Sequence, residues 1–274
     1  MKKISRRSFL AAAGLSVAAL ALTACGGSSA STASSVASSA ASTSAAAGEL
    51  TTVEAGKLTM ATNAAFPPYE MTTDAGEFEG IDIETAQAIA DKLGLELQID
   101  DMDFDAALLS VQQGKADIVM AGVTVTDERK AVMDFSDCYA TGIQSIIVPE
   151  GSDIASPDDL AGKKIGTQRG TTGYIYCSDD FGDDNVVAYD DGLTAVQALN
   201  NGQVDAVVID NAPAKEFVAA NPGLVILDTS YAEEDYAIGM AKGSSLEDAV
   251  NATLEELKAD GTLQAIVDKY ITAE

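Results

Sequence analysis

Histidine is absent from this chain of 274 residues, and cysteine is scarce. Without histidine, neither the Ser–His nor the Cys–His nucleophile pair can form, and the commonest zinc ligand is missing. The three cysteines, Cys25, Cys138 and Cys177, do not have the spacing of a metal site. Cys138 and Cys177 could pair in an exported protein, but we predict two free thiols. We therefore expect neither a metal nor a cofactor, and neither of these catalytic pairs.

Basic side chains are also few: 16 Lys and Arg stand against 43 Asp and Glu, a formal net charge of −27. Four of the 16, Lys2, Lys3, Arg6 and Arg7, lie in the first seven residues. If this leader is removed, 12 basic residues remain against 43 acids, and the net charge becomes −31. Such a charge argues against nucleic acid or an anionic membrane surface as a partner.

The apolar stretch at residues 9–22 is too short, and too rich in alanine, to span a membrane as a helix. With the basic residues before it, this stretch predicts a secretion signal over residues 1–25. Residues 5–10 (SRRSFL) resemble a twin-arginine export motif, and an ordinary basic leader explains them equally well.

Residues 22–26 (LTACG) resemble the lipobox of bacterial lipoproteins, in which Cys25 would be lipidated and become the first residue of the mature chain. A lipid on Cys25 would anchor the protein at the outer face of the cell membrane. Residues 26–48 are almost wholly Ser, Ala, Thr and Gly without charge, a composition that cannot bury enough apolar surface to fold. We predict a flexible tether there.

From about residue 49 the sequence alternates between strand and helix patterns. Strands are predicted at 57–61, 95–99, 117–121, 142–149, 163–168, 186–189, 204–210 and 236–240. Helices are predicted at 81–93, 104–113, from 172 onward, 193–200, 245–259 and 263–270, with a capped turn at 156–160. The prolines at 67 and 68 predict a fixed loop over residues 62–70. This alternation indicates a parallel α/β sheet.

Two parts of the chain are similar to each other. Gly114 and Asp117 lie between a helix and a buried strand, and Gly202 and Asp205 repeat this pattern 88 residues later. The repeat predicts two related α/β lobes, although helix–strand units look alike in any α/β protein. The elements at 236–270 follow a second unit that is already complete, so we assign them to the first lobe. Lobe 1 is then 49–140 plus 234–274, and lobe 2 is 141–233, with crossings near 139–142 and 232–236.

The stretch at residues 114–136 contains the first candidate site. The predicted strand at 117–121 delivers Gly122, Thr124, Thr126 and Arg129 in one short span. Backbone N–H groups, a hydroxyl and a guanidinium that converge can bind a carboxylate, which arginine holds in bidentate geometry. The alternative is that Thr126 caps a helix and Arg129 lies on the surface.

Ligands of open parallel sheets bind outside the carboxyl ends of the strands. The residues at those ends are Asn63, Phe66, Gly122, Thr124 with Arg129, Gly170, Thr172 and Asp210. This set offers a cation for a carboxylate, an anion for an ammonium and a ring for apolar contact, which a free α-amino acid requires. The start of a helix near Gly170 adds N–H donors. Asp210 could instead cap a helix before Pro213.

At this point the sequence resembles a known family over residues 50–272. The motifs are AFPPYE at 65–70, GIDI at 80–83, FD at 104–105, GKAD at 114–117, TDER at 126–129, DFS at 134–136, GTT at 170–172 and DGT at 260–262. They are similar to those of the extracytoplasmic solute-binding proteins of family 3, the amino-acid-binding lipoproteins of polar amino-acid ABC importers. The resemblance implies the type II periplasmic-binding-protein fold, with two lobes, two crossovers and the ligand in the cleft.

The resemblance also implies a role for each candidate residue. Arg129 would hold the ligand carboxylate, helped by the Thr124 hydroxyl and the Thr172 N–H. Asp210 and the Gly122 carbonyl would take the ammonium. Phe66 and Phe104 would sandwich the ligand side chain, and Asn63 and Gln168 would tune its choice.

The neutral amide of Asn63 stands where many relatives carry an acid, and therefore favours a neutral or polar amino acid. The resemblance further implies a monomeric binding protein, not an enzyme, that closes on an amino acid and delivers it to the permease of an ABC importer. The alternatives are a dehydratase-like enzyme and a sensory surface protein on the same fold.

Overall fold

The structure is a computed structural model that describes residues 50–271. The predicted signal (1–25), the candidate lipidation site Cys25 and the predicted tether (26–48) lie outside these residues. Within residues 50–271, no helix has both the length and the apolar character that a membrane span requires.

The first sheet has five strands in the order β5-β1-β6-β14-β7. They are β1 (Lys57–Thr62), β5 (Glu96–Asp101), β6 (Ile118–Val119), β7 (Met133–Phe135) and β14 (Gly239–Ala241). β1 is parallel to β5 and β6, whereas β14 runs antiparallel to β6 and β7. Since β14 lies some 100 residues after β7 in the sequence, the C-terminal part of the chain returns to this sheet.

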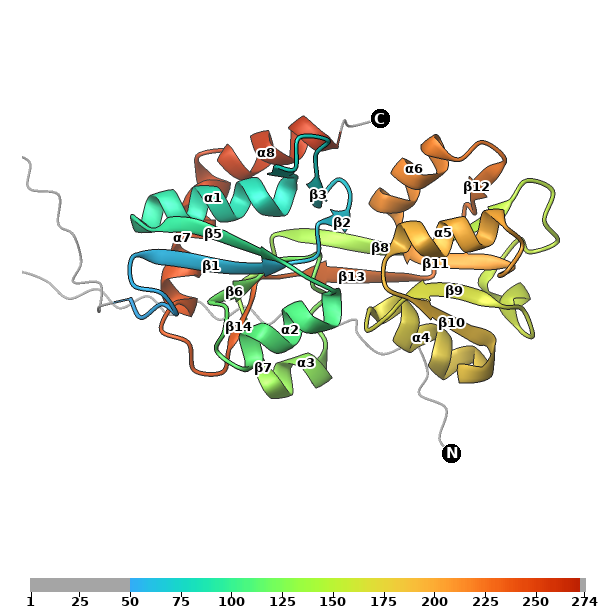
Figure 1. Cartoon of the computed structure of the whole chain (residues 1–274), viewed down its shortest axis with the longest axis horizontal. Coiled ribbons are helices and arrows are strands. Elements are labelled where there is room, and N and C mark those ends of the chain that lie inside the picture. Colours follow the sequence, from blue (N-terminus) through green and yellow to red (C-terminus); the bar gives the residue numbers. More distant parts are fainter. Residues whose placement is uncertain (1–49, 272–274) are drawn as a thin grey trace, which may run out of the picture. The chain divides into compact units, whose positions relative to one another are not determined.

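Helices cover both faces of the first sheet (Figure 1). α1 (Ile81–Leu93), α7 (Glu247–Ala259) and α8 (Thr262–Tyr270) pack together on one face. α2 (Phe104–Gln112) packs on the other face, where the short α3 (Asp127–Val132) also lies. The predicted bounds of α1 are confirmed because Gly94 ends the helix in the left-handed conformation, at φ 70°.

The second sheet has the order β10-β9-β11-β8-β12, and β13 pairs with β8 beyond this path. The strands are β8 (Ala140–Pro149), β9 (Ile165–Gln168), β10 (Val186–Tyr189), β11 (Ala206–Asp210), β12 (Leu224–Ile226) and β13 (Ala232–Tyr236). Its helices are α4 (Thr172–Phe181), α5 (Gly192–Asn200) and α6 (Asn211–Ala220), with short 3₁₀ turns η1 (Pro157–Leu160) and η2 (Asp183–Asn185). α4 lies on the face opposite α5 and α6 (Figure 1).

β8 and β13 link the two sheets. They pair antiparallel from Ala140 with Tyr236 to Gln144 with Ala232, and both run between the sheets in Figure 1. The strand predicted at 236–240 is therefore wrong as one element. β13 ends at Tyr236 in the second sheet, and the chain then crosses to β14 in the first.

The loop predicted at residues 62–70 contains secondary structure that the sequence pattern did not indicate. β2 (Ala65–Phe66), β3 (Glu70–Thr72) and β4 (Phe78–Glu79) form a small antiparallel sheet, and Pro67 and Pro68 lie in the turn between β2 and β3. These strands are two or three residues long, too short to show an alternating pattern. They place Phe66 and Glu70 at the end of β1.

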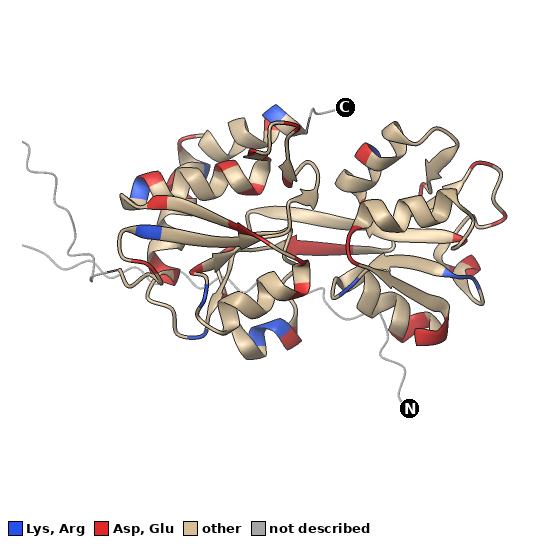
Figure 2. Ribbon diagram, viewed as in Figure 1, with Lys and Arg blue, Asp and Glu red and all other residues tan. Residues whose placement is uncertain are grey.

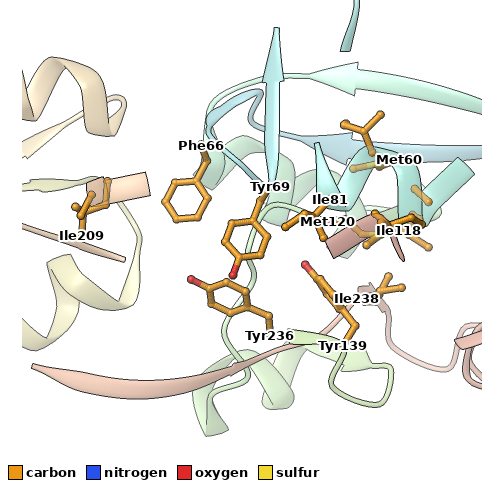
Figure 3. Close-up of a cluster of buried hydrophobic side chains, with 14 of the residues drawn as sticks. Met60, Phe66, Tyr69, Ile81, Ile118, Met120, Tyr139, Ile209, Tyr236 and Ile238 are labelled. Atoms are coloured by element: carbon orange, nitrogen blue, oxygen red, sulfur yellow. The ribbon is translucent and has the colours of Figure 1, made fainter. Parts of the chain in front are cut away.

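A group of aromatic rings packs where the two sheets meet (Figure 3). The ring of Tyr69 lies 5.9 Å from that of Phe66 and 5.3 Å from that of Tyr236, measured between centroids. Tyr139 belongs to the same buried cluster. Phe66 also lines the candidate site, and the phenols of the cluster are buried from water.

Acidic residues outnumber basic residues in the described part of the chain. Acidic positions are spread over helices, strands and loops, with β13 among them, and basic positions are few and scattered (Figure 2). Cys138 is exposed and Cys177 is buried, and the two are free thiols. Burial raises the pKa of the Cys177 thiol to about 12, so it packs as a small apolar group.

Candidate ligand-binding site

One cavity brings together all nine residues that the sequence analysis assigned to ligand binding. It is lined by Asn63, Phe66, Glu70, Phe104, Ala121, Gly122, Thr124, Arg129, Gln168, Thr171, Thr172 and Asp210. These residues come from both sheets and from the helices that follow their strands. Their contact with a ligand stays a prediction.

Arg129 is buried in this cavity, with 9% of its surface exposed. Its Nη1 donates to the carbonyl of Thr124 (2.8 Å) and its Nη2 to that of Gly170 (3.1 Å). Thr126 does cap α3 by accepting from the Arg129 backbone N–H, but the alternative of a surface arginine is wrong. Burial lowers the pKa of Arg129, but arginine stays charged in proteins. A buried cation bound to neutral carbonyls can still accept an anion.

Glu234 is a buried acid that the sequence analysis missed. Its Oε2 accepts from the hydroxyls of Thr172 (2.9 Å) and Thr124 (3.1 Å) and from Nε2 of Gln144 (3.0 Å). The run of acids at 233–235 looks like a solvated surface. Strand periodicity was the available signal, since it places Glu234 on the same face as the buried Tyr236.

Asp210 ends β11 and precedes α6, but its side chain makes no capping bond. Asp210 therefore occupies the N-cap position of α6, as the alternative supposed, but its carboxyl does not act as the cap. Its Oδ2 accepts from Nε2 of Gln144 at 2.7 Å, so the two amide hydrogens of Gln144 serve Asp210 and Glu234. Burial raises the pKa of Asp210 to about 7. Ionised Asp210 would be a strong partner for an ammonium.

Gly122 has a positive φ of 55°, and a Cβ at this position would lie 2.9 Å from the ring of Phe66. Glycine is therefore required both by the backbone conformation and by the close approach of the ring. The Gly122 N–H donates to Oδ2 of Asp82 at 3.0 Å. This bond fixes the peptide beside the cavity.

Asn63 and Gln168 connect the two sheets at another side of the cavity. Nε2 of Gln168 donates to Oδ1 of Asn63 at 2.8 Å, and Nδ2 of Asn63 donates to the carbonyl of Met102 at 3.0 Å. Phe104 lies beside them and receives the Arg129 guanidinium at 5.4 Å from its ring centroid. The cavity therefore combines charged groups with neutral amides, and the Phe104 ring packs against the Arg129 guanidinium.

Comparison with known proteins identifies the family to which this chain belongs. The sequence model of the bacterial extracellular solute-binding proteins, family 3, matches residues 58–273. The chain belongs to this family.

Three relatives illustrate the range of family 3 proteins to which the chain is similar. The L-cystine-binding protein TcyJ of Escherichia coli K12 is 33% identical over 226 residues, 81% of this chain and 85% of TcyJ. The arginine-, lysine-, histidine-binding protein ArtJ of Geobacillus stearothermophilus is 34% identical, with a TM-score of 0.76 over 80% of this chain and 96% of ArtJ. An ancestral arginine-binding protein bound to glutamine is 41% identical, with a TM-score of 0.76 over 80% of this chain and 99% of that chain.

The fold of this family 3 protein is thus the two-lobed α/β fold of the periplasmic binding proteins, as predicted. The relatives are solute-binding transport proteins. Within residues 50–271, no three His, Cys, Asp or Glu side chains are grouped to hold a metal ion.

Proposed function

We propose that this protein captures a free α-amino acid between its lobes outside the cytoplasm and delivers it to an ABC importer, without changing it chemically. The observation that carries this proposal is the pairing of opposite charges in one cavity. Arg129, buried and bound to neutral carbonyls, lines the same cavity as the buried carboxyl of Asp210. A zwitterionic amino acid carries the complementary pair of charges, a carboxylate for Arg129 and an ammonium for Asp210.

Arg129 would bind the ligand carboxylate. A guanidinium carries five N–H donors, and two of them are used by the carbonyls of Thr124 and Gly170. The remaining donors can hold a carboxylate in bidentate geometry. The backbone N–H of Thr172, at the start of α4, adds a donor at the positive end of a helix dipole.

Asp210 and the Gly122 carbonyl would bind the ligand ammonium. We assign the Thr124 hydroxyl to this end as well, whereas the sequence analysis assigned it to the carboxylate. A hydroxyl has one proton, and that of Thr124 goes to Glu234. Its oxygen can then only accept from the ligand, which suits an ammonium rather than a carboxylate.

The lobes would be residues 49–140 with 234–274, and residues 141–233. Arg129 belongs to the first and Asp210 to the second, so an amino acid bound to both would favour the closed state over the open one. Closure would also remove water, and charge pairs become stronger in the lower dielectric.

A neutral or polar side chain is the first candidate for the ligand. The acids that line the cavity are Glu70 and Asp210, and the second of these would be engaged by the ammonium. The amides of Asn63 and Gln168 offer polar contacts without charge. Burying an additional ligand charge without a partner costs several kcal/mol.

A cationic side chain is the second candidate, because Phe104 also borders a neighbouring cavity that is rich in acids. This cavity is lined by Asp103, Phe104, Asp105, Ala106, Arg169 and Asp190. A long cationic side chain that passed Phe104 could reach these carboxylates. Family 3 relatives described as arginine-binding support this candidate.

Calorimetry on the purified, ligand-stripped protein tests the proposal and separates the two candidates. We expect one of the twenty amino acids or cystine to bind and to be recovered unchanged by mass spectrometry. Chemical conversion of the ligand, or no binding by any of them, would overturn the proposed function. Arginine or lysine binding tenfold tighter than glutamine, serine, methionine and cystine would select the cationic candidate.

The membrane anchor would be a lipid on Cys25, with residues 26–48 as the tether between the lipid and the folded protein. We expect Cys25→Ser to move the protein from the membrane fraction to the soluble fraction, or to leave it held by an uncleaved leader. Cys138→Ser is the matched control, because Cys138 is an exposed thiol of the folded part. A Cys25→Ser protein that is processed and retained like the wild type would rule out the lipid anchor.

A further inference from the structure

Two carboxyl groups lie buried side by side behind the ammonium end of the cavity. Glu70 is in β3 and Asp82 is in α1, and both are 0% exposed. Glu70 also lines the ligand cavity. The Asp82 backbone N–H donates to the carbonyl of Tyr69 (2.8 Å), the residue before Glu70. The two carboxyls are thereby close enough to share a hydrogen bond when one of them is protonated. Neither has an ion pair with a Lys or Arg in the described part of the chain.

The hydrogen bonds of this pair are unevenly distributed. Oδ2 of Asp82 accepts from the Gly122 N–H (3.0 Å) and from the Tyr139 hydroxyl (2.8 Å). Oδ1 of Asp82 and both oxygens of Glu70 accept from no described donor. If both groups were ionised, two adjacent buried anions would leave three oxygens without donors, which costs several kcal/mol. A single proton on Glu70 that is donated to Oδ1 of Asp82 removes one charge and satisfies two of these three oxygens, and the remaining Glu70 oxygen is then that of a neutral acid.

The proton belongs on Glu70. Asp82 already receives two donors on its other oxygen, and these stabilise its anion. Glu70 receives none, and it faces further acids: Asp82 from α1, Asp101 from β5 and Asp210 from the end of β11. The nearby phenols, Tyr69, Tyr139 and Tyr236, are neutral at physiological pH, and burial raises their pKa values further above that range. Since no Lys or Arg of the described residues forms an ion pair with Glu70, its anion is not favoured by a cation there.

We propose that Glu70 is a neutral carboxylic acid that donates its proton to Asp82, and that this pair positions Gly122 at the ammonium end of the ligand cavity. Glu70 is a positioning residue, since it acts through Asp82 and the Gly122 peptide. Its neutrality also leaves Asp210 as the anion lining the cavity. In agreement with this geometry, burial raises the pKa of Glu70 well above its usual range, whereas that of Asp82 rises only to about 6.

Infrared spectroscopy tests the protonation without any ligand. At pH 7 the ligand-free protein should show a buried carboxylic acid C=O band, and Glu70→Gln should lose the Glu70 part of this band while the part from half-protonated Asp210 remains. Glu77→Gln is the matched control, because it is the same substitution at an exposed position of the same small hairpin. Glu77→Gln should retain the band. A band that persists unchanged in Glu70→Gln would overturn the proposal.

Affinity for the bound amino acid tests the positioning, and this second measurement rests on the proposed function. We expect Glu70→Ala to lose at least tenfold in affinity at pH 7. Glu70→Gln should stay within threefold of the wild type, because its amide can also donate to Asp82. If Glu70→Ala fails to fold, the pH dependence of the affinity still tests the role of Glu70, through a comparison of the wild type with Glu70→Gln.

The affinities of the wild type and of Glu70→Gln, measured as a function of pH, should differ at high pH. The wild type should lose affinity relative to Glu70→Gln once Glu70 ionises, because glutamine has no proton to lose and deprotonation of the ligand affects both proteins equally. Superimposable profiles up to pH 10, or a folded Glu70→Ala that binds like the wild type, would overturn the positioning role. If no protein binds an amino acid and the Glu70 part of the infrared band is still lost in Glu70→Gln, the proposed function fails while the protonated pair stands.

Discussion

At the scale of single residues, the side chains that the sequence placed at strand ends lie together, and the side chains that support them were missed. Arg129 and Asp210 followed from the rule that ligands bind beyond the carboxyl ends of parallel strands. Gln144 and Glu234 lie in the middle of strands β8 and β13. Their roles depend on the pairing of β8 with β13, which lie far apart in the sequence, and strand patterns alone do not show which strands pair.

Arg129→Ala should abolish amino-acid binding and leave the fold intact. The substitution removes a buried cation that donates to two neutral carbonyls and packs on the Phe104 ring, so the carboxylate of the ligand would be left half-paired at a cost of about 2–5 kcal/mol. Calorimetry measures the affinity, and thermal unfolding checks the fold. Lys130→Ala, at the next position and exposed, is the control that should bind normally. Binding by Arg129→Ala within threefold of the wild type would remove Arg129 from the site.

The raised pKa of Asp210 predicts that the affinity for an amino acid depends on pH. Its pKa in the ligand-free protein is raised to about 7, so about half of the carboxyls are ionised at pH 7 and roughly a tenth at pH 6. An ammonium binds the ionised form. Affinity should therefore fall about fivefold from pH 7 to 6, and about tenfold for each further unit.

The same shift has the opposite sign for stability. Between the ordinary pKa of 3.8 and about 7, the folded ligand-free protein binds more protons at Asp210 than the unfolded chain does. The contribution of Asp210 to the free energy of unfolding therefore decreases as pH rises through this window. Asp210→Asn should bind weakly and lack the Asp210 part of both dependences, while the part of the stability profile that comes from Asp82 and Glu70 remains. Parallel pH profiles for the wild type and Asp210→Asn would show that another group titrates.

At the scale of secondary-structure elements, long periodic segments were predicted well and short or crossing ones were not. The bounds of α1 followed from its apolar face and Gly94. The small sheet of β2, β3 and β4 has strands of two or three residues, which leave no period to detect. The single strand predicted at 236–240 is two strands because the chain changes sheets after Tyr236.

β13 contributes to the site through one side chain, and Glu234→Ala tests this contribution. Removal of its carboxylate would leave the Thr124 and Thr172 hydroxyls and the Gln144 amide without their common acceptor. We expect the free energy of unfolding of the ligand-free protein to fall by about 1–3 kcal/mol. Denaturant unfolding measures this value. Glu233→Ala is the matched control, since Glu233 is exposed on the other face of the same strand. Equal stability of the two variants would mean that Glu234 holds none of these groups.

At the scale of the whole molecule, the choice of ligand depends on where the lobes meet. Asn63 follows a strand of the first sheet and Gln168 ends a strand of the second, and their hydrogen bond joins the two. Residue types alone predicted a neutral lining. The sequence already placed acids beside Phe104, among them Asp103, which could reach a cationic side chain. It did not show that the two amides bind each other or that Asp190 joins these acids, because both facts depend on how the two sheets meet.

Asn63→Asp should shift the ligand preference toward cationic amino acids. An aspartate at this position keeps the acceptor for Gln168 and replaces the amide that donates to the Met102 carbonyl with an anion. Buried without a partner, this anion is costly, and a cationic ligand side chain would compensate it. We expect arginine to gain at least tenfold relative to glutamine, measured by calorimetry on ligand-stripped protein. Asp103→Asn, which changes an acid of the neighbouring cavity, distinguishes the two routes for a cation. If the wild type already prefers arginine and Asp103→Asn abolishes that preference, the acids beyond Phe104 determine the ligand, and the neutral class is wrong.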